Sequence, residues 1–157
     1  MPYHQGRLID HIGIHVSDLA RSRTFYLAIL KALGKSDGFG GDDKVFYFDE
    51  LYIGSEGLPS SNLHLAFQAN SIEAVHAFHC AGITAGGTDN GQPGYREYHK
   101  SYYAAFLLDP DGNNVEAVCD VGATRSSASV IVTRNGGDAC PLTSLPPLPS
   151  PRWAGIF

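Results

Sequence analysis

The chain has 157 residues, of which 43% are hydrophobic and 17% charged, and these values are typical of one globular domain with a buried core. Its net charge of -5 argues against a nucleic-acid partner, which needs a basic stripe, and against a polybasic membrane contact. No apolar run approaches the roughly 18–20 residues of a spanning helix, and the start lacks the layout of a signal peptide. Three widely spaced cysteines favour a reducing compartment. We therefore expect a cytoplasmic protein without a nucleic-acid or membrane partner.

Two segments of the chain begin alike, at His11 and at His64. Each starts with a histidine and continues with the period-two alternation of a short strand that has one apolar face. About 53 residues separate the two histidines, so the pattern indicates an internal repeat.

A helix is predicted after each of these strands. Its N-cap is expected at Ser17 in the first half and at Asn70 in the second, six positions after each histidine. Helical periodicity follows both caps, and the glycines that would end the helices are Gly34 and Gly82.

Shorter strands follow each predicted helix. In the first half a glycine-rich link precedes strand-like segments at 44–48 and 51–54. In the second half a polar loop, 86–94, precedes segments at 102–108 and 114–119, which the turn sequence DPDG joins into a hairpin. A repeated order of strand, helix and hairpin predicts an α+β domain, with helices on one side of curved, antiparallel-rich sheets.

The composition changes near residue 121, where Ser, Thr, Gly and Pro become frequent. We interpret residues 1–120 as the domain, with modules at about 8–56 and 62–120, and residues 121–157 as a C-terminal tail. The tail is expected to pack on the domain or on a neighbouring subunit, and a polyproline-type ligand segment is the alternative.

Three side chains of metal-binding type are expected on pocket-facing strand positions. Residues two apart in a strand share a face, which puts His11 and His15 on one face of the first strand. By the same alternation His64 and Glu116 oppose the apolar faces of their own strands. If these faces converge, His11, His64 and Glu116 form a two-histidine, one-carboxylate set for a divalent metal. The alternative for the histidines is a role as pocket-lining hydrogen bonders, and His15 is a candidate substrate contact.

The aromatic and charged segment 95–103 is the other candidate source of chemistry. An arginine there can grip a carboxylate, and a histidine can carry protons near neutral pH. Adjacent strand residues alternate, so only one of Tyr102 and Tyr103 can point into a pocket. The alternative is a loop packed by its own tyrosines. The catalytic candidates are Arg96, His99 and Tyr103, and the substrate-binding candidates are Tyr98 and Tyr102.

Three motifs together resemble the glyoxalase/bleomycin-resistance/extradiol-dioxygenase (vicinal-oxygen-chelate) superfamily. HIGIHVSDLARSRTFY at 11–26 is similar to the family's opening strand and helix, HLAF at 64–67 to its second-half opening, and LLDPDGNNVEAV at 107–118 to its closing hairpin. The resemblance covers about residues 8–120. It implies two βαβββ modules around a shared pocket.

The resemblance also implies a ligand set. The family's ligand positions correspond to His11, His64 and Glu116, and the metal implied is divalent: Zn, Ni, Fe or Mn. Glyoxalase I-type members need a fourth ligand from the end of the first half, where this chain has Tyr52 or Ile53. This difference weakens a glyoxalase I assignment.

Two functions remain open at this point. The first is a metal-dependent lyase, isomerase or dioxygenase whose metal is chelated by two oxygens of a small substrate and acts as a Lewis acid. The second is a metal-free protein that sequesters a drug-like or aromatic ligand, as bleomycin-resistance proteins do. The resemblance implies a homodimer for either, because short two-module members usually dimerise.

Overall fold

The computed structural model describes residues 9–127, and internal contacts divide the chain into two units, 1–123 and 124–157. The first unit contains two modules with the same order of elements. The first module is β1 (Ile12–His15), α1 (Leu19–Ala32), β2 (Phe39–Gly41), β3 (Val45–Phe48) and β4 (Leu51–Gly54). The second is β5 (His64–Gln68), α2 (Ile72–Thr84), β6 (Thr88–Tyr95), β7 (Tyr102–Leu108) and β8 (Asn114–Asp120). The predicted pair of βαβββ modules is confirmed.

Each module forms its own four-stranded mixed sheet. The strand orders are β1-β4-β3-β2 and β5-β8-β7-β6, so the first and last strands of each module are neighbours. These two neighbours run parallel, and the other pairs in each sheet are antiparallel. In each module the first strand, which contains a histidine, therefore lies beside the last strand.

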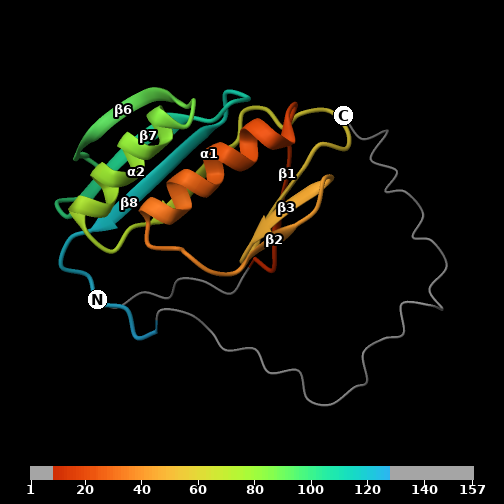
Figure 1. The fold of residues 1–157 in the computed structure, drawn as a ribbon. Coiled ribbons are helices and arrows are strands. Elements are labelled where there is room, and N and C mark those ends of the chain that lie inside the picture. Colours follow the sequence, from red (N-terminus) through yellow and green to blue (C-terminus); the bar gives the residue numbers. More distant parts are fainter. Residues whose placement is uncertain (1–8, 128–157) are drawn as a thin grey trace, which may run out of the picture. The chain divides into compact units, whose positions relative to one another are not determined.

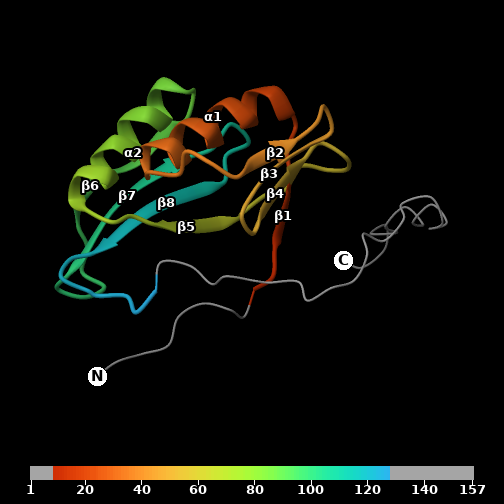
Figure 2. The same cartoon turned by 60° about the horizontal axis from the view of Figure 1, so that its bottom comes forward.

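The core lies between the sheets and the two helices. Helices α1 and α2 pack against each other on one side of the sheets (Figure 1, Figure 2). Alternate strand residues such as Ile14 and Ile53 face these helices and are almost completely buried, as are Val115 and Ala117 in β8. The other face of each sheet therefore carries the remaining alternate residues. We call these surfaces the open faces of the two sheets. Within residues 9–127, neither helix is long and apolar enough to cross a membrane.

Both helix N-caps lie one residue later than predicted. Asp18 caps α1 through a hydrogen bond from the Arg21 backbone N–H at 3.0 Å, and Ser71 caps α2 by the same kind of bond. The prediction of Ser17 was wrong because its hydroxyl donates instead to Asp111 of the second module. Ser71, which also bears a capping oxygen, takes the place predicted for Asn70.

The predicted helix stop at Gly82 was also wrong. Helix α2 continues to Thr84, and Gly86, with a positive φ of 94°, follows its C-cap. Gly82 lies inside the helix. A larger residue would not fit there, because a Cβ would come within 2.2 Å of Leu107 and 3.0 Å of Ile29. Close packing of the two helices and β7 explains this glycine. The other predicted stop, Gly34, does follow α1 and has a positive φ of 81°.

The polar segment predicted as a loop, 86–94, mostly forms the edge strand β6. Its pairing with β7 is interrupted by two register shifts, between Asp89 and Gly91 and between Gly91 and Gly94. These irregularities remove the period-two pattern by which a strand is recognised, and they fit an edge strand rich in glycine with one proline.

A buried polar group ties the two modules together. Asp109, in the turn before β8, is 4% exposed and accepts hydrogen bonds from the backbone N–H groups of Asp111 and Asn113. It also accepts a bond of 2.9 Å from the hydroxyl of Tyr26, which comes from α1 and is completely buried. A carboxylate in the core needs such donors, so the DPDG turn is held to the helix of the other module.

We expect Tyr26→Phe to lower the free energy of unfolding by about 1–3 kcal/mol, because the buried carboxylate of Asp109 loses one donor. Urea unfolding followed by circular dichroism measures the change. Tyr47→Phe, at a ring that is 39% exposed, is the matched control. Equal losses in the two variants would contradict the assignment of Tyr26 as a buried tie.

Candidate functional site

The open face of the second sheet brings together His64 and Glu116. In the parallel pairing of β5 with β8, His64 lies opposite Asn114 and Ala66 lies opposite Glu116. His64 and Glu116 are therefore on the same face of the sheet and offset by two residues along the strands. His64 Nε2 lies 3.1 Å from Glu116 Oε2. Two of the three predicted metal ligands are thus neighbours within one module.

Glu116 is a buried carboxylate on the open face of the second sheet. Its side chain is only 2% exposed, whereas that of His64 is 52% exposed. The second carboxylate oxygen, Oε1, accepts a 2.6 Å hydrogen bond from the hydroxyl of Tyr102 on β7. Burial, together with this bond to Glu116, raises the pKa of Tyr102 above its ordinary value. Glu116 therefore has a partner on each oxygen.

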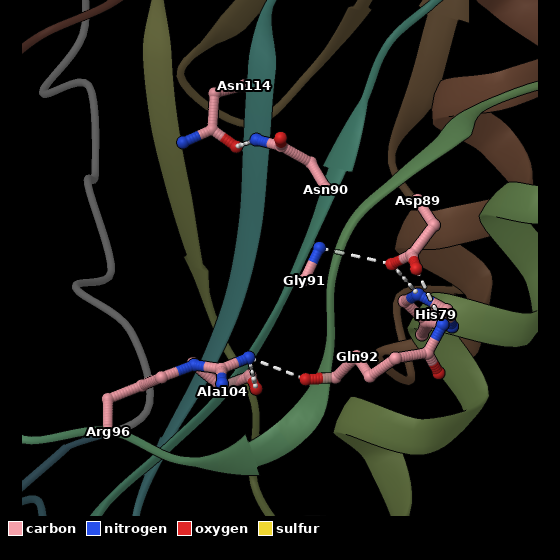
Figure 3. Close-up of polar contacts among 8 residues, drawn as sticks. All are labelled: His79, Asp89, Asn90, Gly91, Gln92, Arg96, Ala104 and Asn114. Carbon is pink, nitrogen blue, oxygen red and sulfur yellow. Dashed lines mark hydrogen bonds and ion pairs between the residues drawn. The ribbon is translucent and has the colours of Figure 1, made fainter.

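Two asparagines continue the polar contacts on the other side of His64. Asn114 Nδ2 lies 2.6 Å from His64 Nδ1, and Asn114 Oδ1 accepts a 3.0 Å bond from Asn90 Nδ2 on β6. Figure 3 shows the two amides meeting across the sheet. Sequence reasoning assigned neither asparagine a role. The available signal was that Asn114 precedes Glu116 by two residues and so shares its face.

The first sheet carries a matching but different pair. Tyr52 lies opposite Gly13 in the parallel pairing of β1 with β4, and this is the register of Glu116 opposite Ala66. His11 precedes Gly13 by two residues, as His64 precedes Ala66. The rings of His11 and Tyr52 are edge to face at 5.5 Å.

This register distinguishes Tyr52 from Ile53, the two candidates for the family's fourth ligand position. Tyr52 is on the open face and 42% exposed, whereas Ile53 is completely buried under α1. Where the second module has the carboxylate of Glu116, the first module has a phenol.

The structure does not bring His11 to the other two predicted ligands within the chain. The His11 ring is 62% exposed, and its Nδ1 lies 2.7 Å from the carboxylate of Asp10. Among residues 9–127, no three His, Cys, Asp or Glu side chains are close enough together to hold one ion.

His15, predicted to contact substrate, lies beside an open hollow on the first sheet. The hollow has a volume of about 400 Å³. Nδ1 of His15 is hydrogen-bonded to the Glu56 carbonyl, and its backbone N–H donates to Ser60 Oγ at 3.0 Å. His15 thus fastens the link between the modules to β1. The hollow is lined by Gly13, Ile14, His15, Asp42, Lys44, Val45, Tyr52, Gly54 and Glu56.

The aromatic segment surrounds Tyr102. The rings of Tyr98 and His99 both meet the Tyr102 ring edge to face, at 5.0 Å and 5.1 Å. Tyr98 is 71% exposed, and His99 Nδ1 lies 3.1 Å from Ser101 Oγ. These two rings therefore form an accessible aromatic edge next to the phenol that holds Glu116.

Arg96 braces the hairpin of β6 and β7 on the same sheet. Its Nη2 donates to the carbonyls of Gln92 and Ala104, as Figure 3 shows, and its guanidinium carbon lies 5.1 Å from the centre of the Phe106 ring. These contacts occupy one end of the guanidinium with backbone carbonyls.

Tyr103, predicted as catalytic, lies on the helix side of its sheet. It is 9% exposed, and its hydroxyl is 2.8 Å from His76 Nε2 on α2. Because Tyr102 is adjacent in β7, the two rings point to opposite faces, and Tyr102 is the one beside Glu116.

A separate histidine pair fastens β6 to α2. His79 Nε2 lies 2.9 Å from Asp89 Oδ1, and Asp89 also accepts bonds from the Gln92 side chain and the Gly91 backbone (Figure 3). The hydrogen bond with His79 is the main cause of the lowered pKa of Asp89. This cluster is structural, because all its contacts hold the irregular edge strand in place.

A family model described as the Glyoxalase/Bleomycin resistance protein/Dioxygenase superfamily matches residues 8–117. The chain belongs to this superfamily. A solved structure of a glyoxalase/bleomycin resistance protein from Albidiferax ferrireducens T118 has 34% sequence identity to it and a TM-score of 0.62. The match covers 71% of this chain and 98% of that chain.

Solved structures with lower sequence identity share the fold. A glyoxalase-related enzyme from Fulvimarina pelagi has 15% identity and a TM-score of 0.57, with 71% of this chain and 87% of that chain covered. The lactoylglutathione lyase from Agrobacterium tumefaciens has 15% identity and a TM-score of 0.51, with 73% and 95% covered. No curated protein matches the chain.

The tyrosines Tyr102 and Tyr26 predict how stability depends on alkaline pH. Burial is the main cause that raises both pKa values above the ordinary value of 10.0, so both phenols keep their protons in the folded state at a pH where the unfolded chain loses them. We therefore expect the free energy of unfolding to fall as the pH rises above 10, since the unfolded state then binds fewer protons than the folded state.

Urea unfolding at a series of pH values measures this slope. Tyr102→Phe and Tyr26→Phe should each make the decline above pH 10 shallower. A decline as steep in both variants as in the wild type would contradict the raised pKa values.

Proposed function

We propose that the protein is a divalent-cation-dependent enzyme of its superfamily, a lyase or isomerase or a dioxygenase, acting on a small substrate with two neighbouring oxygens. The contact between His64 Nε2 and Glu116 Oε2, at 3.1 Å on the open face of the second sheet, carries this proposal. An apolar side chain could fill the place of Glu116 without burying a carboxylate, so packing alone does not explain this pair.

The donor set fits a divalent cation. Imidazole nitrogen and carboxylate oxygen are ligands of Zn, Ni, Fe and Mn. Two such atoms, each about 2.0–2.2 Å from one ion, are roughly 3–3.5 Å apart, and the observed separation falls in this range. The ion would supply a Lewis acid that binds the two substrate oxygens and stabilises negative charge on them.

The third ligand in this proposal is His11 of a second copy of the chain. His11 and Tyr52 occupy on the first sheet the register positions that His64 and Glu116 occupy on the second. A homodimer that places the first sheet of one copy over the second sheet of the other would complete a two-histidine, one-carboxylate site. Tyr52 would then face the position left open for substrate.

The remaining residues of the second sheet have positioning and binding roles in the proposal. Tyr102 keeps its proton and holds Glu116 Oε1, which leaves Oε2 for the cation. Tyr98 and His99 offer ring edges to a planar substrate, and His99 is the candidate proton carrier because half of its side chain is exposed.

The alternative is a metal-free protein that sequesters a ligand, and one observation favours it. Within residues 9–127 of one chain no third ligand reaches His64 and Glu116, while the accessible rings of Tyr98 and His99 lie against Tyr102, the hydrogen-bond partner of Glu116. An aromatic ligand could then be held by stacking alone.

Cation binding separates these two functions. We expect chelator-treated wild-type protein to bind Zn²⁺ or Co²⁺ in calorimetric titration, and His64→Ala and Glu116→Gln to lose that binding, because each change removes one ligand. His76→Ala, which removes an imidazole on the helix side, is the control and should bind as the wild type does. Absence of binding in the wild type for Zn²⁺, Co²⁺, Ni²⁺, Fe²⁺ and Mn²⁺ would refute the enzymatic proposal and favour sequestration.

Mixing of two variants that each lack cation binding tests the shared site. His11→Ala and His64→Ala should each abolish tight cation binding, but a dimer with one copy of each has one site in which both histidines are intact. We therefore expect mixing and subunit exchange to restore part of the binding. No recovery in mixed dimers, checked by mass spectrometry for exchange, would show that His11 does not complete the site of a partner.

A further inference from the structure

We propose that Asn114 and Asn90 act as an amide relay that sets which ring nitrogen of His64 carries the proton. The inference rests on the proposed function for its consequence, because His64 can bind a cation through Nε2 only when that nitrogen has no proton. Both asparagines are positioning residues in this account, since they act through His64.

The structure shows the relay in one of its two directions. Asn90 donates to Asn114 Oδ1 at 3.0 Å, and Asn114 directs its Nδ2 at His64 Nδ1 from 2.6 Å. His64 Nδ1 must then be the acceptor, so the proton of the neutral ring is on Nε2. From Nε2 it is donated to Glu116 Oε2, 3.1 Å away. In this direction the ring and the carboxylate satisfy each other.

The reverse direction needs no displacement of the chain. The oxygen and the NH₂ group of an asparagine amide are similar in size, so rotation of the amide by about 180° exchanges donor and acceptor. With both amides turned, Asn90 presents its oxygen to Asn114, and Asn114 presents its oxygen to His64. The Nδ1 nitrogen then carries the proton, and the Nε2 lone pair is available to a cation, which would replace the donor that Glu116 Oε2 loses.

The positions of the two residues suit this exchange. Asn114 is fixed opposite His64 by the pairing of β5 with β8, whereas the Asn90 side chain is exposed on the irregular edge strand. Water can therefore satisfy whichever half of the Asn90 amide is left over. Half of the His64 ring is also exposed, so water can carry the proton from Nε2 to Nδ1 with no change in net charge.

The relay differs from simple support of the ring in one respect. A residue that only packs against His64 would be replaceable by a side chain of the same shape. A relay requires that the direction of the Asn90 bond be transmitted through Asn114. Changing Asn90, which is hydrogen-bonded to Asn114 and not to His64, should therefore alter the protonation of His64 Nδ1.

Asn90→Asp tests the transmission in metal-free protein. A carboxylate can only accept, so Asn114 must turn its Nδ2 toward the new side chain and its Oδ1 toward His64. Nitrogen-15 NMR of the imidazole ring distinguishes protonated from unprotonated nitrogens. We expect Nδ1 of His64 to be unprotonated in the wild type and to carry a proton in Asn90→Asp. Gln68→Glu is the control. It adds the same negative charge on the face of β5 that carries His64, and it should leave the wild-type protonation of the ring.

Asn114→Leu tests the consequence for binding. Leucine keeps approximately the shape of asparagine but neither donates nor accepts, so the free Nδ1 proton of the binding form loses its acceptor. We expect the affinity for Co²⁺ to fall about 10–100-fold, the range found when a partner of a ligating histidine is removed, and not to fall in Asn90→Asp. Circular dichroism and urea unfolding confirm that the variants are folded.

The outcomes separate the relay from the proposed function. An unchanged tautomer in Asn90→Asp, or an affinity in Asn114→Leu within threefold of the wild type, would overturn the relay while leaving cation binding intact. A wild type that binds no cation but shows the tautomer shift in Asn90→Asp would retain the relay and refute the cation-dependent function.

Discussion

The buried carboxylate of Glu116 is the constraint on which the second sheet's open face depends. An ionised group that is only 2% exposed is costly unless each oxygen is paired. Tyr102 and His64 supply these pairs from the strands on either side of β8. Asn114 then follows, because the outer nitrogen of His64 also needs a partner. One buried charge thus fixes the orientation of side chains on three adjacent strands.

Much of this arrangement could be predicted from the sequence, because strand alternation is a local property. Alternation placed His64 and Glu116 on the faces away from the core, and it required Tyr102 and Tyr103 to diverge. It could not say which of the two tyrosines faces the site, because both faces of β7 are partly apolar and only the packing of α2 against Tyr103 decides it. The resemblance to the superfamily supplied the order of the modules, and the fold confirms it.

The failures of prediction have a common physical origin in contacts between distant segments. Ser17 has a good capping side chain, but Asp111 of the other module engages it. Gly82 reads as a helix stop, yet it is small because Leu107 and Ile29 approach the helix there. Asn90 lies on a strand whose two register shifts erase its periodicity, so its meeting with Asn114 is visible only in three dimensions.

The two modules share one register but distribute their chemistry unequally, and this bears on how a shared site would assemble. The second module bears the cost of burying its carboxylate within its own fold, through His64 and Tyr102. The first module exposes His11, whose Nδ1 lies beside Asp10, and Tyr52, whose ring contacts those of His11 and Tyr47. Recruiting His11 into a site would therefore cost little, since an exposed imidazole has few contacts to lose. Cation binding would replace the bond between His64 and Glu116 that already holds both side chains in place. In the proposed dimer the second sheet thus supplies a preorganised pair of ligands, and the partner's first sheet supplies the third from an exposed side chain.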